Sequence, residues 1–428
     1  MTLASSRREF LRRAGITAAA AGIPGALLAS RAAAAPPPGA RSIVCIYQRG
    51  GCDALNLLVP YEDKDYLAAR PTLSMQLAGG LVDLDGDFAL HPSLRGLMPF
   101  WESKQLAPIV CVGSPHPTRS HFAAQDYMEY AALAMPSMRQ GWLNRYLAIS
   151  AGEEKVDFRS MAMQEILPRS LRGDFPVLAV PTKMDNRRGT LTLERFERFY
   201  GKDENDGMGG TPEPAGAGAG DAMDVRPDEN AAVVMSGKQT LETLKRFQEI
   251  TSAGRESRVR YPETSFGGRM RSIAKVLKAG VGLEVAGIDY GGWDHHIQEG
   301  GVEGDFANKL QDLGGTVAAL AEDLGPQLDD VLILVMTEFG RTVRENGNNG
   351  TDHGRGGLML ALGGGVRGGQ VHGDWRGLKD GVLADGRDLS VTTDFRDVMA
   401  ACLQGTFDFK PPRDFFPDYK PGKFRLFS

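Results

Sequence analysis

Short apolar runs alternate with segments of helical periodicity along most of the chain. The apolar runs are rich in strand-forming residues and predict strands that are buried on both faces. They cover residues 42–48, 107–112, 160–163, 281–288, 331–337 and 358–362. Helical patterns cover residues 122–133, 239–252, 269–279, 304–324 and 395–405. This order predicts an α/β fold in which a mostly parallel central sheet is flanked by helices on both faces.

The first segment has the pattern of an export signal. Arg7 and Arg8 stand at the start of a stretch, residues 6–35, in which an alanine-rich apolar run is followed by small residues. This order is typical of a twin-arginine signal peptide, and we expect cleavage after Ala34. It predicts that residues 1–34 are removed and that the protein is periplasmic or secreted. No later run reaches the roughly 18 to 20 apolar residues that cross a membrane, so no transmembrane anchor is expected after signal removal.

We expect residues 41–428 to form a single domain with one insertion. The stretch 201–231 breaks the regular alternation with seven glycines, three prolines and eight acidic residues. Such a composition cannot bury enough apolar area to offset the entropy of ordering it. The sequence therefore predicts a flexible acidic surface loop at this position.

Composition narrows the functional classes. The chain has 428 residues, of which 54 are glycine, about 13% against a usual share of roughly 7%, and they follow no three-residue period. This favours a loop-rich, enzyme-like scaffold over a fibrous protein. With 49 basic and 54 acidic residues the chain offers no global positive field, so no nucleic acid partner is expected. Four cysteines without CxxC spacing are too few for a disulfide framework.

Polar residues follow the first two predicted strands, at the end of the strand where an open α/β sheet binds its ligands. Asp53 comes after two glycines and can supply a carboxylate oxygen to a cation, although an aspartate in this setting is more often a turn residue. Ser120 opens the helix predicted from residue 122. Free N–H groups at a helix start favour an alkoxide or an anionic substrate, and the alternative is an ordinary serine N-cap.

The later strand ends carry carboxylates, imidazoles and an arginine. These residues are Asp294, His296, Glu338, Arg341, Asp352 and His353. Carboxylates and imidazoles this close can share a divalent cation, with zinc the first choice and manganese, magnesium or calcium as alternatives; a loop with solvated histidines is the simpler interpretation. Glu338 emerges from a very apolar strand, where a charge is costly unless it is metal-bound or paired, for example with Arg341. Arg341 or Arg355 can instead hold a phosphate or sulfate with a bidentate fork.

The order of these motifs resembles a known family. RGGCDALN, TRSHFAAQ, GGWDHH, TEFGRT and GTDHGRGG, behind a twin-arginine signal, resemble the exported bacterial family called domain of unknown function 1501. An aspartate, a helix-opening serine, an Asp/His cluster, a late acid and a final histidine, in that order, also resemble the alkaline phosphatase and sulfatase superfamily. The resemblance covers residues 42–405, nearly the whole chain after the signal.

The resemblance implies an alkaline phosphatase/sulfatase-like fold and a metal-dependent hydrolase of phosphate or sulfate esters with one or two divalent ions. Its substrate would be a small anionic ester or a sulfated or phosphorylated glycan, and an exported protein partner is allowed. Asp53 and Glu338 would belong to the ion that activates Ser120 as nucleophile. The ligands of the other ion would be Asp294, His296 and His353.

Two positions depart from the superfamily pattern. The superfamily has Asp-His where this chain has Glu338 and Phe339, and its Asp-to-His spacing is longer than the gap from Asp294 to His296. The candidates for a missing ligand are His116, His121 and Asp352. The loss of an imidazole at Phe339 favours an alternative function, in which a non-catalytic sulfatase-like protein binds a polysaccharide or a partner protein. Ser120 with Asp53 favours the hydrolase.

Replacing Arg7 and Arg8 together by lysine should leave a full-length precursor in the cytoplasm, because lysine lacks the planar guanidinium that the export receptor reads. Immunoblots of cytoplasmic and periplasmic fractions measure this. An unchanged amount of mature protein outside the inner membrane would contradict the export hypothesis.

Overall fold

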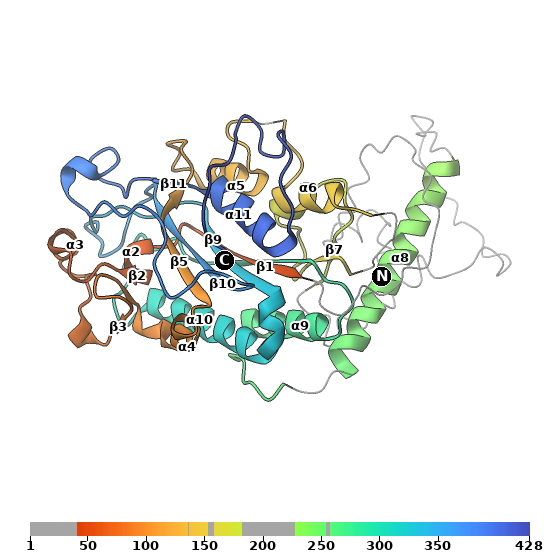
Figure 1. The fold of residues 1–428 in the computed structure, drawn as a ribbon, viewed down its shortest axis with the longest axis horizontal. Helices are drawn as coiled ribbons and strands as arrows, with labels where there is room; N and C mark the ends of the chain where they lie inside the picture. Colours follow the sequence, from red (N-terminus) through yellow and green to blue (C-terminus); the bar gives the residue numbers. More distant parts are fainter. Residues whose placement is uncertain (1–40, 136, 153–157, 182–226, 254–256) are drawn as a thin grey trace, which may run out of the picture.

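The computed structural model describes residues 41–135, 137–152, 158–181, 227–253 and 257–428. Its centre is an eight-stranded sheet in the order β11-β5-β10-β9-β1-β8-β6-β7 (Figure 1). Neighbouring strands are parallel except around β10, which runs antiparallel to β5 and β9. The strands are β1 (Ser42–Arg49), β5 (Leu106–Gly113), β6 (Ser160–Ala162), β7 (Leu178–Ala179), β8 (Val285–Gly291), β9 (Val331–Thr337), β10 (Gly357–Gly363) and β11 (Thr393–Asp394). The predicted α/β class with a mostly parallel sheet is confirmed.

Helices cover both faces of the sheet, because consecutive side chains of its long strands are apolar and point to opposite faces. In β1, Val44 and Ile46 join one buried cluster, and Ile43, Cys45 and Tyr47 join the other. The first cluster is covered by α4 (Met98–Glu102), α9 (Ser265–Lys278) and α10 (Asp305–Leu324), and the second by α5 (His121–Tyr130), α6 (Trp142–Ile149) and α11 (Phe395–Phe407) (Figure 1). Two buried layers thus hold the sheet between them.

A smaller unit follows β1. Its helices are α2 (Ala54–Leu57) and α3 (Lys64–Ala69), and its antiparallel sheet consists of β2 (Leu58–Val59), β4 (Ala89–Leu90) and β3 (Val82–Asp83). These elements are too short to leave a periodic pattern in the sequence, and they were not predicted. Their apolar side chains join the same buried cluster as Val44 and Ile46.

Several element boundaries differ from the predictions by a few residues, and two of these differences have a local cause in the sequence. α8 (Pro227–Ala253) begins before the predicted residue 239, so residues 227–231 of the expected loop are helical. Proline at the first helical position, followed by acidic residues, suits a helix start. The remainder of that loop and the expected signal peptide lie outside the described residues. β8 begins at Val285 instead of residue 281, because Gly280 and Gly282 have φ of 64° and 87°, which a strand does not accommodate.

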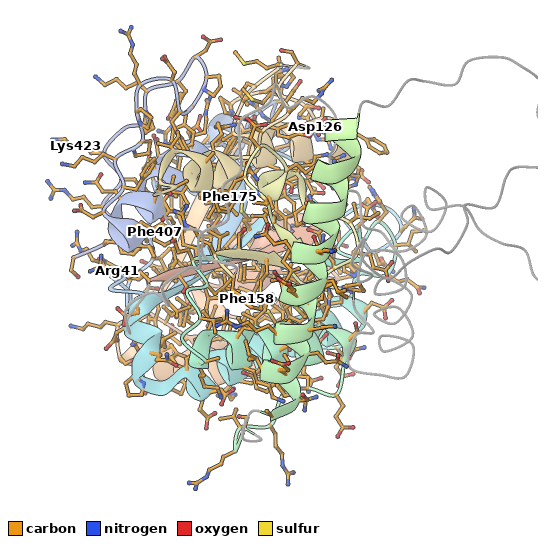
Figure 2. The ribbon with its side chains drawn as sticks, turned by 90° about the vertical axis from the view of Figure 1, so that its right-hand side faces the viewer. Arg41, Asp126, Phe158, Phe175, Phe407 and Lys423 are labelled. Atoms are coloured by element: carbon orange, nitrogen blue, oxygen red, sulfur yellow. The ribbon has the colours of Figure 1, made fainter. Side chains whose placement is uncertain are left out.

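α8 runs along the edge of the sheet that ends in β7. It contacts β7 and α9, and the side view shows it running past Phe158 (Figure 2). The Arg246 guanidinium of α8 lies 5.6 Å from the centre of the Phe158 ring. The helix therefore covers one end of the sheet, where an exposed strand edge would invite association with another chain.

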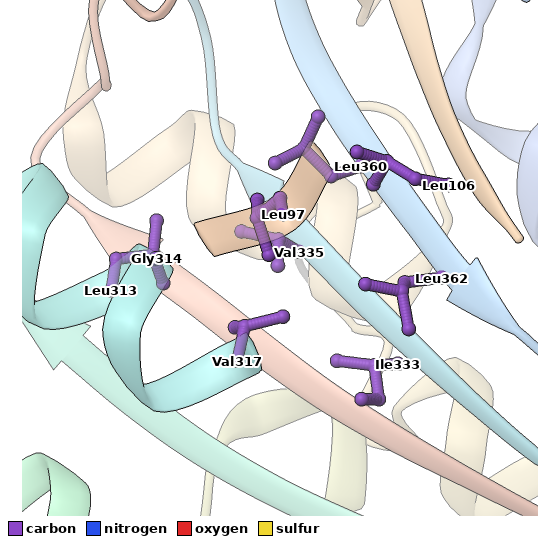
Figure 3. Close-up of a pocket in the computed structure, with 9 residues that line it drawn as sticks. All are labelled: Leu97, Leu106, Leu313, Gly314, Val317, Ile333, Val335, Leu360 and Leu362. Carbon is purple, nitrogen blue, oxygen red and sulfur yellow. The ribbon is translucent and has the colours of Figure 1, made fainter. Parts of the chain in front are cut away.

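An apolar cavity of about 10 Å³ lies between α10 and the sheet (Figure 3). It is lined by Leu97, Leu106, Leu313, Gly314, Val317, Ile333, Val335, Leu360 and Leu362. A cavity of this size without polar partners holds no ordered water and no ligand. This cavity is therefore a packing defect of the core and not a ligand site.

Neither disulfides nor spanning helices shape this part of the chain. Cys45, Cys52, Cys111 and Cys402 are all buried and unpaired. None of the helices in the described ranges combines the length and the apolarity needed to cross a membrane.

The register of the sheet brings several loops to one edge. β1, β8 and β9 are parallel, and Arg49 lies opposite Gly291 while Gln48 lies opposite Thr337. The residues after all three strands therefore leave the sheet at the same edge. Because β10 is antiparallel, it begins there, and the segment before Gly357 returns to the same place.

Gly340→Ala should destabilise the protein by about 3 kcal/mol or more, because a Cβ at residue 340 would lie 1.8 Å from the backbone oxygen of Gly356. Urea unfolding measures the change. The matched control is Gly347→Ala, since a Cβ on the exposed Gly347 meets nothing within 4 Å. Equal unfolding midpoints for the two variants would show that the two segments are not packed this closely.

Candidate metal centre

Three imidazoles and one carboxylate converge where the strands end. His353 Nε2 lies 3.0 Å from Asp294 Oδ1 and 2.9 Å from His296 Nε2, and His296 Nε2 is 3.0 Å from the same carboxylate oxygen. His121 Nε2 lies 3.3 Å from the other oxygen, Asp294 Oδ2. One ligand atom each of His121, Asp294 and His353 lie within 4.8 Å of one another. The arrangement is a possible metal site.

The Nδ1 atom of each of these imidazoles faces a hydrogen-bond acceptor. The pairs are His121 with Glu338 Oε1 (2.9 Å), His296 with Asp352 Oδ1 (3.3 Å) and His353 with the backbone oxygen of Arg119 (2.8 Å). An acceptor at Nδ1 assigns the N–H of a neutral ring to that atom and leaves a lone pair on Nε2. Histidines that bind metals are held in this way. Three lone pairs and a carboxylate therefore point at one another, an arrangement that a cation stabilises.

A buried, unpaired atom of the His121 ring also fits a cation in the cluster. The Nε2 atom of this ring is buried and, although close to Asp294, makes no hydrogen bond. Leaving a buried polar atom unpaired costs about 1–3 kcal/mol. Phe339 packs beside both rings, with its centre 4.9 Å from that of His121 and 5.0 Å from that of His353. Nε2 itself lies beside Asp294 Oδ2, within the cluster.

Arg341 fixes the carboxylate of the cluster. Its Nη2 donates to Asp294 Oδ1 at 2.5 Å, and its other hydrogen bonds go to the backbone oxygens of Gly50, Gly51, Trp293 and Thr351. Partial burial acts to raise the pKa of Asp294, but the hydrogen bond and charge of Arg341, together with His353 and His296, outweigh it and hold that pKa at about 2. Arg341 is buried and positions Asp294, so it does not present a fork to a substrate anion.

Glu338 and His121 form a buried carboxylate–imidazole pair. Glu338 Oε1 also accepts hydrogen bonds from the backbone N–H of Gly50 (2.9 Å) and from Gln125 Nε2 (3.0 Å). Burial alone raises the pKa of Glu338, yet the bonds from His121 and Gln125 bring it below its ordinary value. The bond to Glu338 in turn raises the pKa of His121. The acid after β9 thus anchors an imidazole of the cluster.

The surroundings shift the pKa values of His353 and His121 in opposite directions. Partial burial lowers the pKa of His353, although its bond to Asp294 opposes the change. A neutral His353 with its proton on Nδ1 presents a lone pair to the cluster at neutral pH. This is the form of imidazole that binds a divalent cation.

Asp53, expected as a metal ligand, is instead paired with an arginine. Its carboxylate is buried, accepts a hydrogen bond from Arg70 Nη2 at 3.0 Å and forms an ion pair with Arg70 Nη1. Burial acts to raise the pKa of Asp53, but the charge and hydrogen bonds of Arg70, together with a hydrogen bond from Glu299, lower it below its ordinary value. Burial and the negative charge of Asp53 raise the pKa of the neighbouring Glu299. Arg70 also donates a hydrogen bond to the backbone oxygen of Thr342, so the pair links Asp53 to the segment that follows β9.

Ser120 lies at the N-cap of α5, directly before His121. Its side chain is exposed and makes no capping hydrogen bond with the helix, so the simple N-cap interpretation does not describe it. Its backbone N–H donates to Thr118 Oγ1 at 3.3 Å. The hydroxyl is therefore open to solvent at a helix start, next to a ring of the cluster.

The residues expected at the site fall into two groups: those whose atoms face one another in the cluster, and anchors, which hold the rings of the cluster in place. Asp294, His296 and His353, expected together, are brought together. Asp352 and Glu338, expected as ligands, hold the Nδ1 atoms of His296 and His121. His121 was one of three candidates for a missing ligand, and the sequence could not choose among them. Of the other two, His116 lies instead against Tyr127, with ring centres 4.9 Å apart.

Comparisons with known proteins agree with the sequence motifs. No curated protein matches the sequence. Among solved structures, the chain is similar to a phosphonate monoester hydrolase from Silicibacter pomeroyi, with 12% identity, 90% of this chain and 78% of that chain covered, and a TM-score of 0.30, which is too low to support an argument about activity. Residues 40–408 match the family described as a protein of unknown function (DUF1501). The chain belongs to this family.

Proposed function

We propose that this protein is an exported, metal-dependent hydrolase of phosphate or sulfate esters, with Ser120 as nucleophile. The observation that carries the proposal is the convergence of three anchored imidazoles on the Asp294 carboxylate. The donor set of nitrogen and carboxylate oxygen suits zinc first, with manganese, magnesium or calcium as alternatives. Its substrates are small anionic esters or sulfated or phosphorylated glycans.

One cation suffices for this proposal. The residues that would hold it are Asp294 and His353 together with His121, His296 or both. When bound, a divalent cation polarises the ester oxygen and favours ionisation of a nearby hydroxyl. The Asp53 carboxylate, paired with Arg70, does not contribute to a second ion in this proposal.

The chain's own groups supply positioning and charge. The free N–H groups at the start of α5 favour negative charge on the Ser120 oxygen and on an anionic ester. Glu338 keeps the His121 ring oriented, and Arg341 keeps Asp294 ionised. Ser120 directly precedes His121, and a serine hydroxyl beside a bound cation is the combination that phosphoryl or sulfuryl transfer to serine requires.

One observation favours the alternative, a non-catalytic protein that uses this edge to bind a polysaccharide or an exported partner protein. Phe339 packs against His121 and His353, in the position after Glu338. An aromatic ring supplies no ligand there. Metal content and esterase activity, measured together, distinguish the two functions.

Purified protein should bind about one divalent ion, and His353→Ala should lose it, because His353 contacts both Asp294 and His296. Elemental analysis gives the metal content. Zinc at about 100 times its Kd should stabilise the wild type by about 2.7 kcal/mol, and this gain should vanish in the variant.

His116→Ala is the matched control, since His116 lies in the loop directly before α5, which begins at His121, but packs on Tyr127. It should retain the ion. Acidification should release the ion, because the imidazoles must be neutral to bind it. Wild-type protein that melts identically with and without zinc, manganese or calcium would count against the metal site.

Ser120→Ala should abolish hydrolysis of chromogenic phosphate, phosphonate or sulfate esters while leaving the metal content unchanged. The control is Ser103→Ala, because Ser103 is also exposed but precedes β5, whereas Ser120 follows it. Equal rates in wild type and Ser120→Ala would refute a covalent role for the serine. A wild type without activity on any of these esters, with or without metal, would favour the binding function.

A further inference from the structure

A buried carboxylate outside the cluster holds two arginines. Asp388 is fully buried and comes from the segment before β11. Its Oδ2 accepts a hydrogen bond from Arg119 Nε at 2.8 Å, and its Oδ1 accepts one from Arg387 Nε at 3.0 Å. Because a buried charge is costly unless it is paired, both arginines are held firmly in this geometry.

Both arginines form hydrogen bonds with His353. The backbone oxygen of Arg119 accepts the hydrogen bond from His353 Nδ1 at 2.8 Å. Nη2 of Arg387 donates to the backbone oxygen of His353 at 3.1 Å. Asp388 thus controls the ring of His353 through one arginine and its backbone through the other.

Arg119 also belongs to the turn that carries the proposed nucleophile. It directly precedes Ser120, which opens α5, and His121, which faces Asp294. A displacement of Arg119 would therefore move the serine, one ring of the cluster and the acceptor of another ring together.

We propose that Asp388 is a positioning residue, which fixes the His353 tautomer and the turn at Ser120 relative to the cation. This inference rests on the proposed function for its purpose, but the tautomer of His353 can be observed in the metal-free protein. None of the sequence motifs pointed to Asp388, because its partner Arg119 lies far from it in the chain.

The full chain with Asp388→Asn tests the proposal. Histidine labelled with ¹⁵N reports ring tautomers in long-range proton–nitrogen spectra, and the chain has only seven histidines, so the His353 signal can be assigned by its loss in His353→Asn. In the wild type His353 should carry its proton on Nδ1. In Asp388→Asn it should become a mixture of tautomers, and the Kd for zinc should rise about tenfold, as when other supports of metal ligands are removed.

Asp385→Asn is the matched control. Asp385 also pairs with Arg119, at 2.7 Å, but its side chain is 55% exposed. Loss of this exposed pair should change the Kd by no more than about twofold. Arg119→Lys provides a second test if Asp388→Asn does not fold, because lysine keeps the charge and the backbone oxygen but loses the fork to Asp388, and it should shift the tautomer in the same direction.

The outcomes separate the two proposals. A wild-type tautomer and a wild-type Kd in a folded Asp388→Asn or Arg119→Lys protein would overturn the positioning role while leaving the metal site intact. If the wild type binds none of zinc, manganese, magnesium or calcium but the tautomer still changes in the variants, the role of Asp388 in fixing the His353 tautomer stands and the hydrolase proposal fails.

Discussion

Four electron-rich atoms facing one another around Asp294 impose the main constraint on this protein. Such an arrangement needs fixed rings, a fixed carboxylate and a positive charge nearby. Arg341 supplies the charge within the chain, and two carboxylates and a backbone oxygen fix the rings. To hold these groups in place, the loop after β1 approaches the loop after β8 closely. A Cβ on Gly50, whose φ is 123°, would lie 2.7 Å from the backbone nitrogen of Asp294.

Much of the fold was predictable because the sheet is buried on both faces. β9 was predicted with both ends correct, and β1 differs by one residue, since uninterrupted apolar runs mark such strands. The direction of β10 was not predictable, because periodicity carries no information on whether a neighbouring strand is parallel. Short strands such as β7 and β11 have too few residues to show a pattern.

The candidate site shows where sequence reasoning reaches its limit. Residue types at strand ends indicated Asp294, His296 and His353, because parallel strands deliver their ends to one edge. They could not reveal whether a carboxylate would face a cation or an arginine. Asp53 pairs with Arg70, which α3 positions, and no spacing rule connects the two. Glu338 and Asp352 likewise act as anchors, because each contacts the Nδ1 atom of a ring instead of facing the other ligand atoms.

The direction of β10 has a further consequence. Because β9 and β10 are antiparallel neighbours, the chain leaves the sheet after Thr337 and returns at Gly357 on the same side, and everything between forms one excursion. Glu338, Arg341 and His353 all belong to it. Opening either end of this segment would therefore release a carboxylate anchor, the guanidinium and a ring in one cooperative event, without disturbing the strands. Local unfolding of this excursion would thus remove three of the groups that build the cluster.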